Sequence, residues 1–234
     1  FNNIIGLIIN TAFIDTKVYL KLNNATFKDI PIEGDLQYEL NDSKSELVVS
    51  LGGVQFEQSR DIVFNINDFG EGTKPEIIYS YSYITGNEYY MSEQSVVTLE
   101  NMNENINSEY ELFRSYVCNQ LMKIIQTNNR LERKHIYNKV ITYYEDNNIR
   151  DDKSYALLDT WKEQMYLCIG SEDSEHASYY HTWGIWYCEQ FLCSLSKQYT
   201  ANFKDKSGEA FKSKLFDEMV DICSEAFDTV EPPK

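Results

Sequence analysis

The sequence predicts an α+β protein in which an antiparallel β-sandwich is followed by a five-helix all-α module. Two observations lead to this prediction. Seven of the ten glycines lie before residue 90, and no proline occurs between Ser108 and Glu231. Turn residues therefore punctuate the first half, while the second half is free to form helices. The apolar pattern changes at the same place, from a period of two residues to a helical one.

The region 13–104 is predicted to hold six or seven short strands. Residues 1–12 precede it and are expected to be the tail of a preceding helix, because their isoleucines follow helical spacing. The predicted strands lie at residues 17–22, 36–40, 47–51, 61–66, 76–84 and 94–99. Turn signals such as Gly52-Gly53 separate them, a spacing typical of an antiparallel sandwich.

The region 107–231 is predicted to form a bundle of five helices with short connections. Ser108 and Glu111 have the spacing of a capping box at the start of the first helix. This helix should end at Asn128-Asn129, and the second near Asn147-Asn148. The other three are expected at residues 152–168, 177–199 and 209–227.

The charge balance excludes two classes of partner. The formal net charge is -16, so the chain should repel the phosphates of nucleic acids and of anionic lipids. The longest apolar run, residues 4–9, is far too short to span a bilayer. We interpret the basic cluster at Arg130, Arg133 and Lys134 as a solvated helix face. We therefore predict protein partners, with no nucleic acid and no membrane.

The five cysteines predict a reducing environment. Their number is odd, and no two of them form a CxxC pair. All fall within helix-like apolar patterns of the second half, which is typical of buried thiols in a reduced protein. We therefore expect a cytoplasmic, intracellular protein. The chain also opens on Phe1 within an apolar pattern, which favours a piece of a longer protein.

The best candidates for a metal site are His176, His181, Cys188 and Cys193. Zinc requires four converging ligands, and the spacings of five, seven and five residues scatter these side chains around a straight helix. On such a helix His181 and Cys188 share a face, but about 10 Å apart along the axis. We interpret the cysteines as core residues and the histidines as half-exposed, and we predict no metal and no cofactor. A Cys/His-dependent hydrolase stays open, because its partners need only be adjacent in space.

The densest aromatic run includes Trp183, Trp186 and Tyr187. It could bind a ligand, but the interleaved aliphatic residues favour a buried helix that is apolar nearly all round. Gly184 within this run would let a neighbouring helix approach closely. No phosphate-binding loop, dinucleotide fingerprint, nucleophile elbow or zinc-protease motif is present.

Several segments resemble the β-sandwich and helical regions of von Willebrand factor A (VWA)–Hint proteins, the "Vwaint" type. Residues 1–22 look like the last helix of a VWA domain passing into the sandwich. Residues 51–64, LGGVQFEQSRDIVF, resemble the family's "LGxLxxGQxRDIV" signature, with Phe56-Glu57 in place of aromatic-Gly. The helical half is similar to "WGxHYLxS … NFKDxG", with Trp186 where the family usually has His. The residues in this structural signature are Gln58, Arg60, Asp61, Trp183, Gly184, Trp186, Tyr187, Asn202, Phe203, Lys204 and Asp205.

The resemblance implies a VWA domain upstream in the same longer chain, and in some relatives a U-box, RING or Hint domain elsewhere. It implies a non-catalytic region that binds protein partners or supports the VWA domain, for example as an adaptor in a ubiquitin-type complex. Two alternatives remain: a structural component of a viral or cellular assembly, and the Cys/His-dependent hydrolase.

Overall fold

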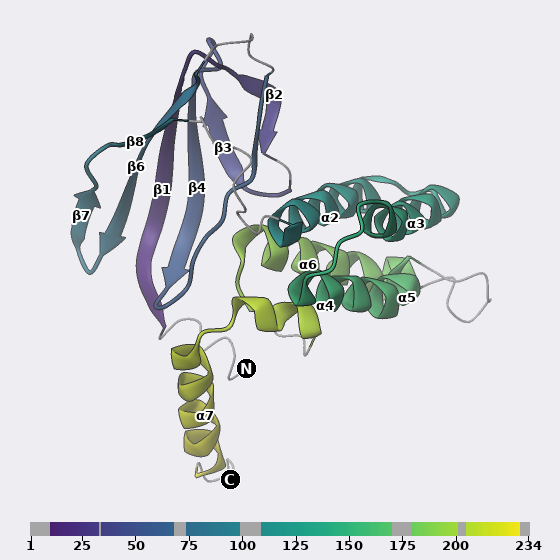
Figure 1. Cartoon of the computed structure of the whole chain (residues 1–234). Coiled ribbons are helices and arrows are strands. Elements are labelled where there is room, and N and C mark those ends of the chain that lie inside the picture. The colour runs from purple at the N-terminus through teal and green to yellow at the C-terminus, as the bar shows by residue number, and fades with distance from the viewer. Residues whose placement is uncertain are drawn as a thin grey trace.

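The computed structural model describes residues 10–32, 34–67, 74–98, 109–169, 179–200 and 205–229. It confirms the predicted fold class, because an antiparallel sheet region is followed by a helical region (Figure 1). The strands are β1 (Thr11–Asn23), β2 (Phe27–Ile32), β3 (Gln37–Leu40), β4 (Glu46–Gln55), β5 (Phe64–Ile66), β6 (Glu76–Thr85), β7 (Glu88–Met91) and β8 (Ser95–Thr98).

The main sheet is built around the three longest strands. Its order is β3-β4-β1-β6-β7, and β8 pairs with β6 next to β7. In a second sheet, β2 pairs with β5. The core of this region combines apolar residues of both sheets, so the two sheets form a sandwich with unequal layers. Its buried members are Leu20, Leu22, Phe27, Ile32, Leu36, Leu47, Val49 and Leu51.

Two predicted strand boundaries were wrong, and two strands, β2 and β7, were not predicted. β1 begins at Thr11, inside the expected helical tail 1–12, because Thr11 pairs with Gln55 of β4; residues 1–9 lie outside the described range. The strand expected at residues 61–66 starts only at Phe64. β7 was not predicted, since all four of its residues are exposed and leave no alternating pattern.

The helical region begins with α2 (Glu109–Gln126) and α3 (Arg130–Asp146). Asn129 caps α3 by accepting hydrogen bonds from the backbone N–H groups of Leu131 and Glu132. Ser108 of the expected capping box lies outside the described residues. Arg133 corrects the prediction of a solvated basic face: it is buried, and its guanidinium lies 3.6 Å from the centroid of the Tyr180 ring.

The third and fourth helices each contain a π-helical turn. α4 (Asp152–Thr160) continues through η1 (Trp161–Met165) into α5 (Tyr166–Cys168), and η2 (Tyr180–Gly184) leads into α6 (Ile185–Lys197). Together with α2 and α3 these elements surround the helical core. Its fully buried large side chains include Phe113, Leu121, Ile124, Leu157, Trp161, Met165, Tyr180 and Leu195.

The predicted fifth helix is divided into two elements. A 3₁₀ segment, η3 (Lys206–Phe211), packs on α4, and a separate helix α7 (Lys214–Asp228) follows. The break occurs where the Ser213 hydroxyl accepts a hydrogen bond from the Phe216 N–H and starts a new helix. In Figure 1, α7 stands apart from the other helices. None of the described helices is long and apolar enough to cross a membrane.

Candidate functional site

The polar residues of greatest interest lie where the sheet meets the helices. We call this region the seam. Its sheet side is the loop after β4, which carries three residues of the predicted structural signature. Its helical side is formed by α2, by the end of α6 and by η3. The members are Gln55, Gln58, Arg60 and Asp61 from the first side, and Glu111, Arg114, Leu195, Gln198 and Phe211 from the second.

Arg114 of α2 is the central cation of the seam, and only 4% of its surface is exposed. Its Nη1 donates to the carbonyl oxygen of Leu195 at 2.8 Å, and its Nη2 donates to that of Asp61 at 2.9 Å. Its Nε also donates to Glu111 Oε2 at 2.7 Å. One buried guanidinium therefore ties α2 to α6 and to the loop of the sheet.

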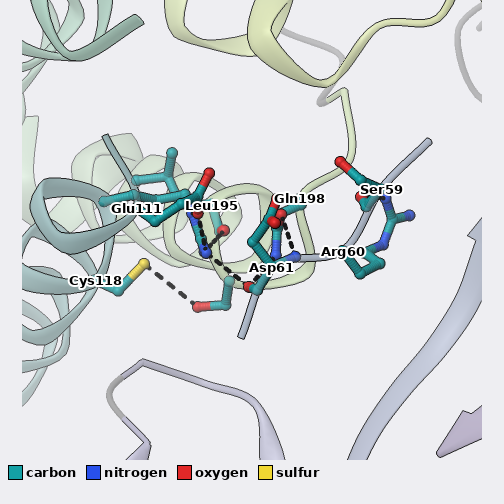
Figure 2. Close-up of polar contacts among 9 residues, drawn as sticks. Ser59, Arg60, Asp61, Glu111, Cys118, Leu195 and Gln198 are labelled. Atoms are coloured by element: carbon teal, nitrogen blue, oxygen red, sulfur yellow. Dashed lines mark hydrogen bonds and ion pairs between the residues drawn. The ribbon is translucent and has the colours of Figure 1, made fainter. Parts of the chain in front are cut away.

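Gln198 binds the same loop in the manner of a neighbouring strand. It follows α6 in the left-handed conformation, with φ of 50°, and is buried. Its Oε1 accepts from the Asp61 backbone N–H at 3.0 Å, and its Nε2 donates to the Asp61 carbonyl oxygen at 2.7 Å. Figure 2 shows these bonds on Asp61. Because both backbone groups of Asp61 are used in this way, the chain cannot pair as a strand at this point, and β5 starts later.

Gln58 and Arg60 complete the sheet side of the seam. Gln58 Nε2 donates to the carbonyl oxygen of Phe211 at 2.5 Å, which connects the loop to η3. Arg60 Nη1 donates to Gln58 Oε1 at 3.0 Å, and its Nη2 bonds to the side chain of Gln55. Burial lowers the pKa of Arg60 to about 10, with the positive charge of Arg114 acting in the same direction. Arg60 is therefore still a cation at neutral pH.

The carboxylate of Glu111 is the acidic partner in the seam. Burial raises the pKa of Glu111, and the attraction of Arg114 opposes this rise. The Glu111–Arg114 pair is separated by 2.6 Å, and the side chains are 22% and 5% exposed respectively. Both residues belong to α2, one turn apart, so the pair orients the Arg114 guanidinium, and neither group is left as a poorly solvated unpaired charge.

The cavity beside these residues is small, with a volume of about 100 Å³. Glu111, Arg60, Gln198 and Tyr110 all contribute to its wall. The Tyr110 hydroxyl is buried and lacks a hydrogen-bond partner among the described residues. Binding pockets for small molecules usually enclose about 300–1,000 Å³, so this space suits a few water molecules rather than a substrate or cofactor.

A second contact across the seam involves the turn between β2 and β3. The Asp35 backbone N–H donates to Ser196 Oγ at 3.2 Å, and that hydroxyl lies 3.6 Å from the Cys118 sulfur. Gly34 has a φ of 93°, and a Cβ on it would lie 2.7 Å from Ser196 Oγ. A side chain at this position would therefore be strained and would push the turn away from α6.

The signature residues of the helical half occupy two different environments. Gly184 is buried against α5, and a Cβ on it would lie 2.5 Å from the carbonyl oxygen of Cys168. This close approach is the role expected for Gly184. Tyr187 is also buried, and its hydroxyl donates to Asp205 Oδ2 at 2.8 Å, which links α6 to the start of η3. The signature residues Asn202, Phe203 and Lys204 lie outside the described residues.

The prediction that Trp183 and Trp186 are core residues was wrong. Trp186 is 65% exposed and Trp183 is 37% exposed, although Trp183 does contact the Tyr187 ring edge-on at 6.2 Å. The helix is apolar on one face only, and its buried residues include Tyr187, Phe191 and Leu195. Trp186 falls on the other face, and Trp183, in η2, lies beside Tyr187 at the edge of the buried face.

The predicted shared face of His181 and Cys188 was wrong as well. His181 is exposed, whereas Cys188 is fully buried with its sulfur 4.0 Å from that of Met165. The reason is the π-helical turn η2, whose wider i→i+5 bonding rotates His181 away from the buried stripe. His176 lies outside the described residues, and Cys193 is partly buried. Within the described ranges, no three His, Cys, Asp or Glu side chains form a group able to hold a metal ion.

All five cysteines, which lie within the described residues, are free thiols, and four of them are buried. A hydrogen bond with Cys188 and burial both raise the pKa of Cys168, which keeps its thiol protonated.

Sequence reasoning missed Arg114, Glu111 and Gln198 as members of the seam. Arg114 did leave a signal, because it lies four residues from both Tyr110 and Cys118 and so interrupts an apolar helical stripe. Gln198 left none, since a glutamine near the end of a helix has no characteristic pattern.

Comparisons of the chain with known protein families, curated proteins and solved structures find no match.

Proposed function

We propose that this chain is a non-catalytic structural and protein-interaction region of a longer VWA-containing protein. The observation that most supports this proposal is that the polar groups of Arg114, Asp61 and Gln198 are engaged in structural hydrogen bonds. These polar groups bond to one another across the seam, and the cavity that Asp61 and Gln198 line there has a volume of only about 100 Å³. Their role is then to hold the sheet and the helices in one arrangement, so that the surfaces of both parts are presented together.

The VWA part of the proposal rests on the resemblance of residues 51–64 and of the helical motifs. In such a protein the preceding VWA domain would pack on or lead into β1, and the protein could serve as an adaptor in a ubiquitin-type or assembly complex. The residues that precede Phe1 in the full-length protein test this directly. A DxSxS metal-ion adhesion loop among them would support the assignment, and a preceding domain without it would remove its basis.

The cytoplasmic, intracellular location is part of the same proposal. Five free thiols, four of them buried, support a reducing compartment, because oxidising compartments favour disulfides.

The function is tested with tagged full-length protein expressed in its own cells. We expect a protein partner to co-purify in a fixed ratio, and to be retained by both the His181→Ala and Cys188→Ala variants. We also expect no ester or amide hydrolysis above background. If Cys188→Ala removes a measured turnover while the partner stays bound, the chain is a Cys/His-dependent hydrolase and the scaffold proposal is wrong.

A further inference from the structure

The part of the main sheet formed by β6 and β7 carries a row of exposed aromatic rings. Tyr81 and Tyr90 are 46% and 41% exposed. Tyr81 stacks on Tyr83 with ring centroids 6.2 Å apart, and Tyr83 stacks on Tyr90 at 5.4 Å. Phe13 of β1 packs on Tyr83 at 4.2 Å, and Tyr79, 37% exposed, extends the row. We call Phe13, Tyr79, Tyr81, Tyr83 and Tyr90 the tyrosine face.

The tyrosine face lies on the same side of the main sheet as the sandwich core, but beyond the area that the second sheet covers. In the register of β1 with β6, Leu20 pairs with Tyr79 and Val18 pairs with Tyr81, so all four side chains share one side. The second sheet covers the part near β1 and β4. Among the described residues, the sandwich core takes Ile77 from β6 and no residue from β7 or β8. In Figure 1 this edge of the sheet points away from the helices.

The charges around the tyrosine face have one sign. Residues 75–113 contain no lysine, arginine or histidine. Glu88 and Glu93 lie on or beside β7, and both are exposed. Lys17 and Lys21 of the neighbouring β1 pair with Ser82 and Ile78, which places them on the opposite side of the sheet. The aromatic rings are therefore flanked by carboxylates without compensating cations from the adjoining strands.

We infer that the tyrosine face binds an extended segment of a protein partner that carries lysine or arginine side chains. The negative faces of aromatic rings attract such cations. The Glu88 carboxylate, which accepts a hydrogen bond from the Tyr90 hydroxyl, is placed to bind a cation beside that ring. The net charge of -16 would steer a basic segment toward the protein. The same charge disfavours nucleic acid, the other common ligand of stacked aromatic rings. This inference rests on the proposed function, since it specifies the partner's chemistry.

Fluorescence anisotropy with labelled decapeptides tests the inference. The probe alternates arginine and threonine, and the control peptide alternates glutamate and threonine. We expect the Tyr81→Ser/Tyr90→Ser variant to bind the basic probe at least about tenfold more weakly than the wild type. The matched control, Tyr38→Ser/Tyr155→Ser, removes two other exposed tyrosines and should bind within about twofold. Circular dichroism and urea midpoints verify that both variants are folded.

A second pair of variants separates the site from the general negative charge. Glu88→Gln should weaken binding of the basic probe, whereas Glu225→Gln on α7 changes the net charge equally and should not. Equal losses from these two variants, or unchanged binding by Tyr81→Ser/Tyr90→Ser, would overturn the inference. The inference would also be overturned if Tyr81→Ser/Tyr90→Ser lost self-association in sedimentation but kept its binding of the basic probe, because the tyrosine face would then bind a second copy of the chain. A full-length Tyr81→Ser/Tyr90→Ser protein that still co-purifies with its partner would overturn this inference alone and leave the proposed function intact.

Discussion

Replacing Arg114 with methionine should destabilise the protein strongly. Methionine retains an apolar stem but provides no donor for the carbonyl oxygens of Leu195 and Asp61 or for the Glu111 carboxylate. Breaking a buried ion pair by removing one partner costs about 3–5 kcal/mol. The Glu111 side chain is 22% exposed, and the Asp61 carbonyl keeps its bond from Gln198. We therefore expect a loss near the lower end, about 3 kcal/mol in the free energy of unfolding.

Urea unfolding monitored by circular dichroism and tryptophan fluorescence measures this loss. The control is Arg150→Met, because Arg150 is exposed and its guanidinium bonds at the surface to Asn148. We expect this control to change the free energy of unfolding by less than about 0.5 kcal/mol. If Arg114→Met also loses less than about 1 kcal/mol, the seam does not hold the two parts together as described.

The stability of the Arg114 variant should also depend on pH through Glu111. Burial raises the pKa of Glu111 in the folded protein, and loss of Arg114 would raise that pKa further. A carboxyl group with a raised folded-state pKa binds its proton more tightly in the folded state. Its contribution to stability is therefore fully present below the unfolded pKa of about 4.3 and is lost as the pH rises through the folded pKa.

Comparison with the Arg114→Met/Glu111→Gln double variant isolates this effect, because the other titrating groups are the same in both proteins. The free energy of unfolding of the single variant should be only slightly below that of the double variant near about pH 4, and this difference should grow toward about pH 8. Equal deficits at the two pH values would show that Glu111 is not buried against Arg114.

Two further predictions concern the helical region, and both are read from urea midpoints. Gly184→Ala places a Cβ 2.5 Å from the Cys168 carbonyl oxygen and should cost about 1–3 kcal/mol, whereas Gly208→Ala meets no atom within 4 Å and should cost less than about 0.5 kcal/mol. Equal effects would contradict the close approach of the helices. Trp161 is fully buried and Trp186 is 65% exposed, so Trp161→Ala should cost about 3–5 kcal/mol and Trp186→Ala less than about 0.5 kcal/mol. A large loss of stability from Trp186→Ala would show that Trp186 is buried.

The elements that the sequence predicted well are those with a regular apolar period. In β1 the alternation of Leu20 and Leu22 with exposed Lys21 survives folding, because one side of the sheet packs on the second layer. α2, α3 and α4 begin close to their expected positions for the same reason. Ser213 is a residue type favoured at helix N-caps, and it marks the start of α7 in the sequence.

The failures come from features that depend on contacts distant in sequence. The separation of His181 from Cys188 follows from the π-helical turn η2, which a constant helical period cannot anticipate. Trp186 is exposed because the buried residues of α6 lie on its other face. The seam is a second example. Asp61 was predicted to belong to a strand, but its backbone bonds instead to the side chains of Gln198, 137 residues away, and of Arg114. No local pattern contains that information.

The central claim is that the seam holds the sheet and the helices together through the backbone of Asp61. Amide hydrogen exchange measured by NMR tests this claim most directly, because Asp61 is exposed in a loop, yet its N–H donates to Gln198 Oε1 at 3.0 Å. We predict that the Asp61 amide exchanges as slowly as the core amides of α6. The Gln198→Ala variant should lose this protection while the α6 amides keep theirs. If the Asp61 amide of the wild-type protein exchanges at the rate of an open loop, the two parts are not joined at the seam and the account is wrong.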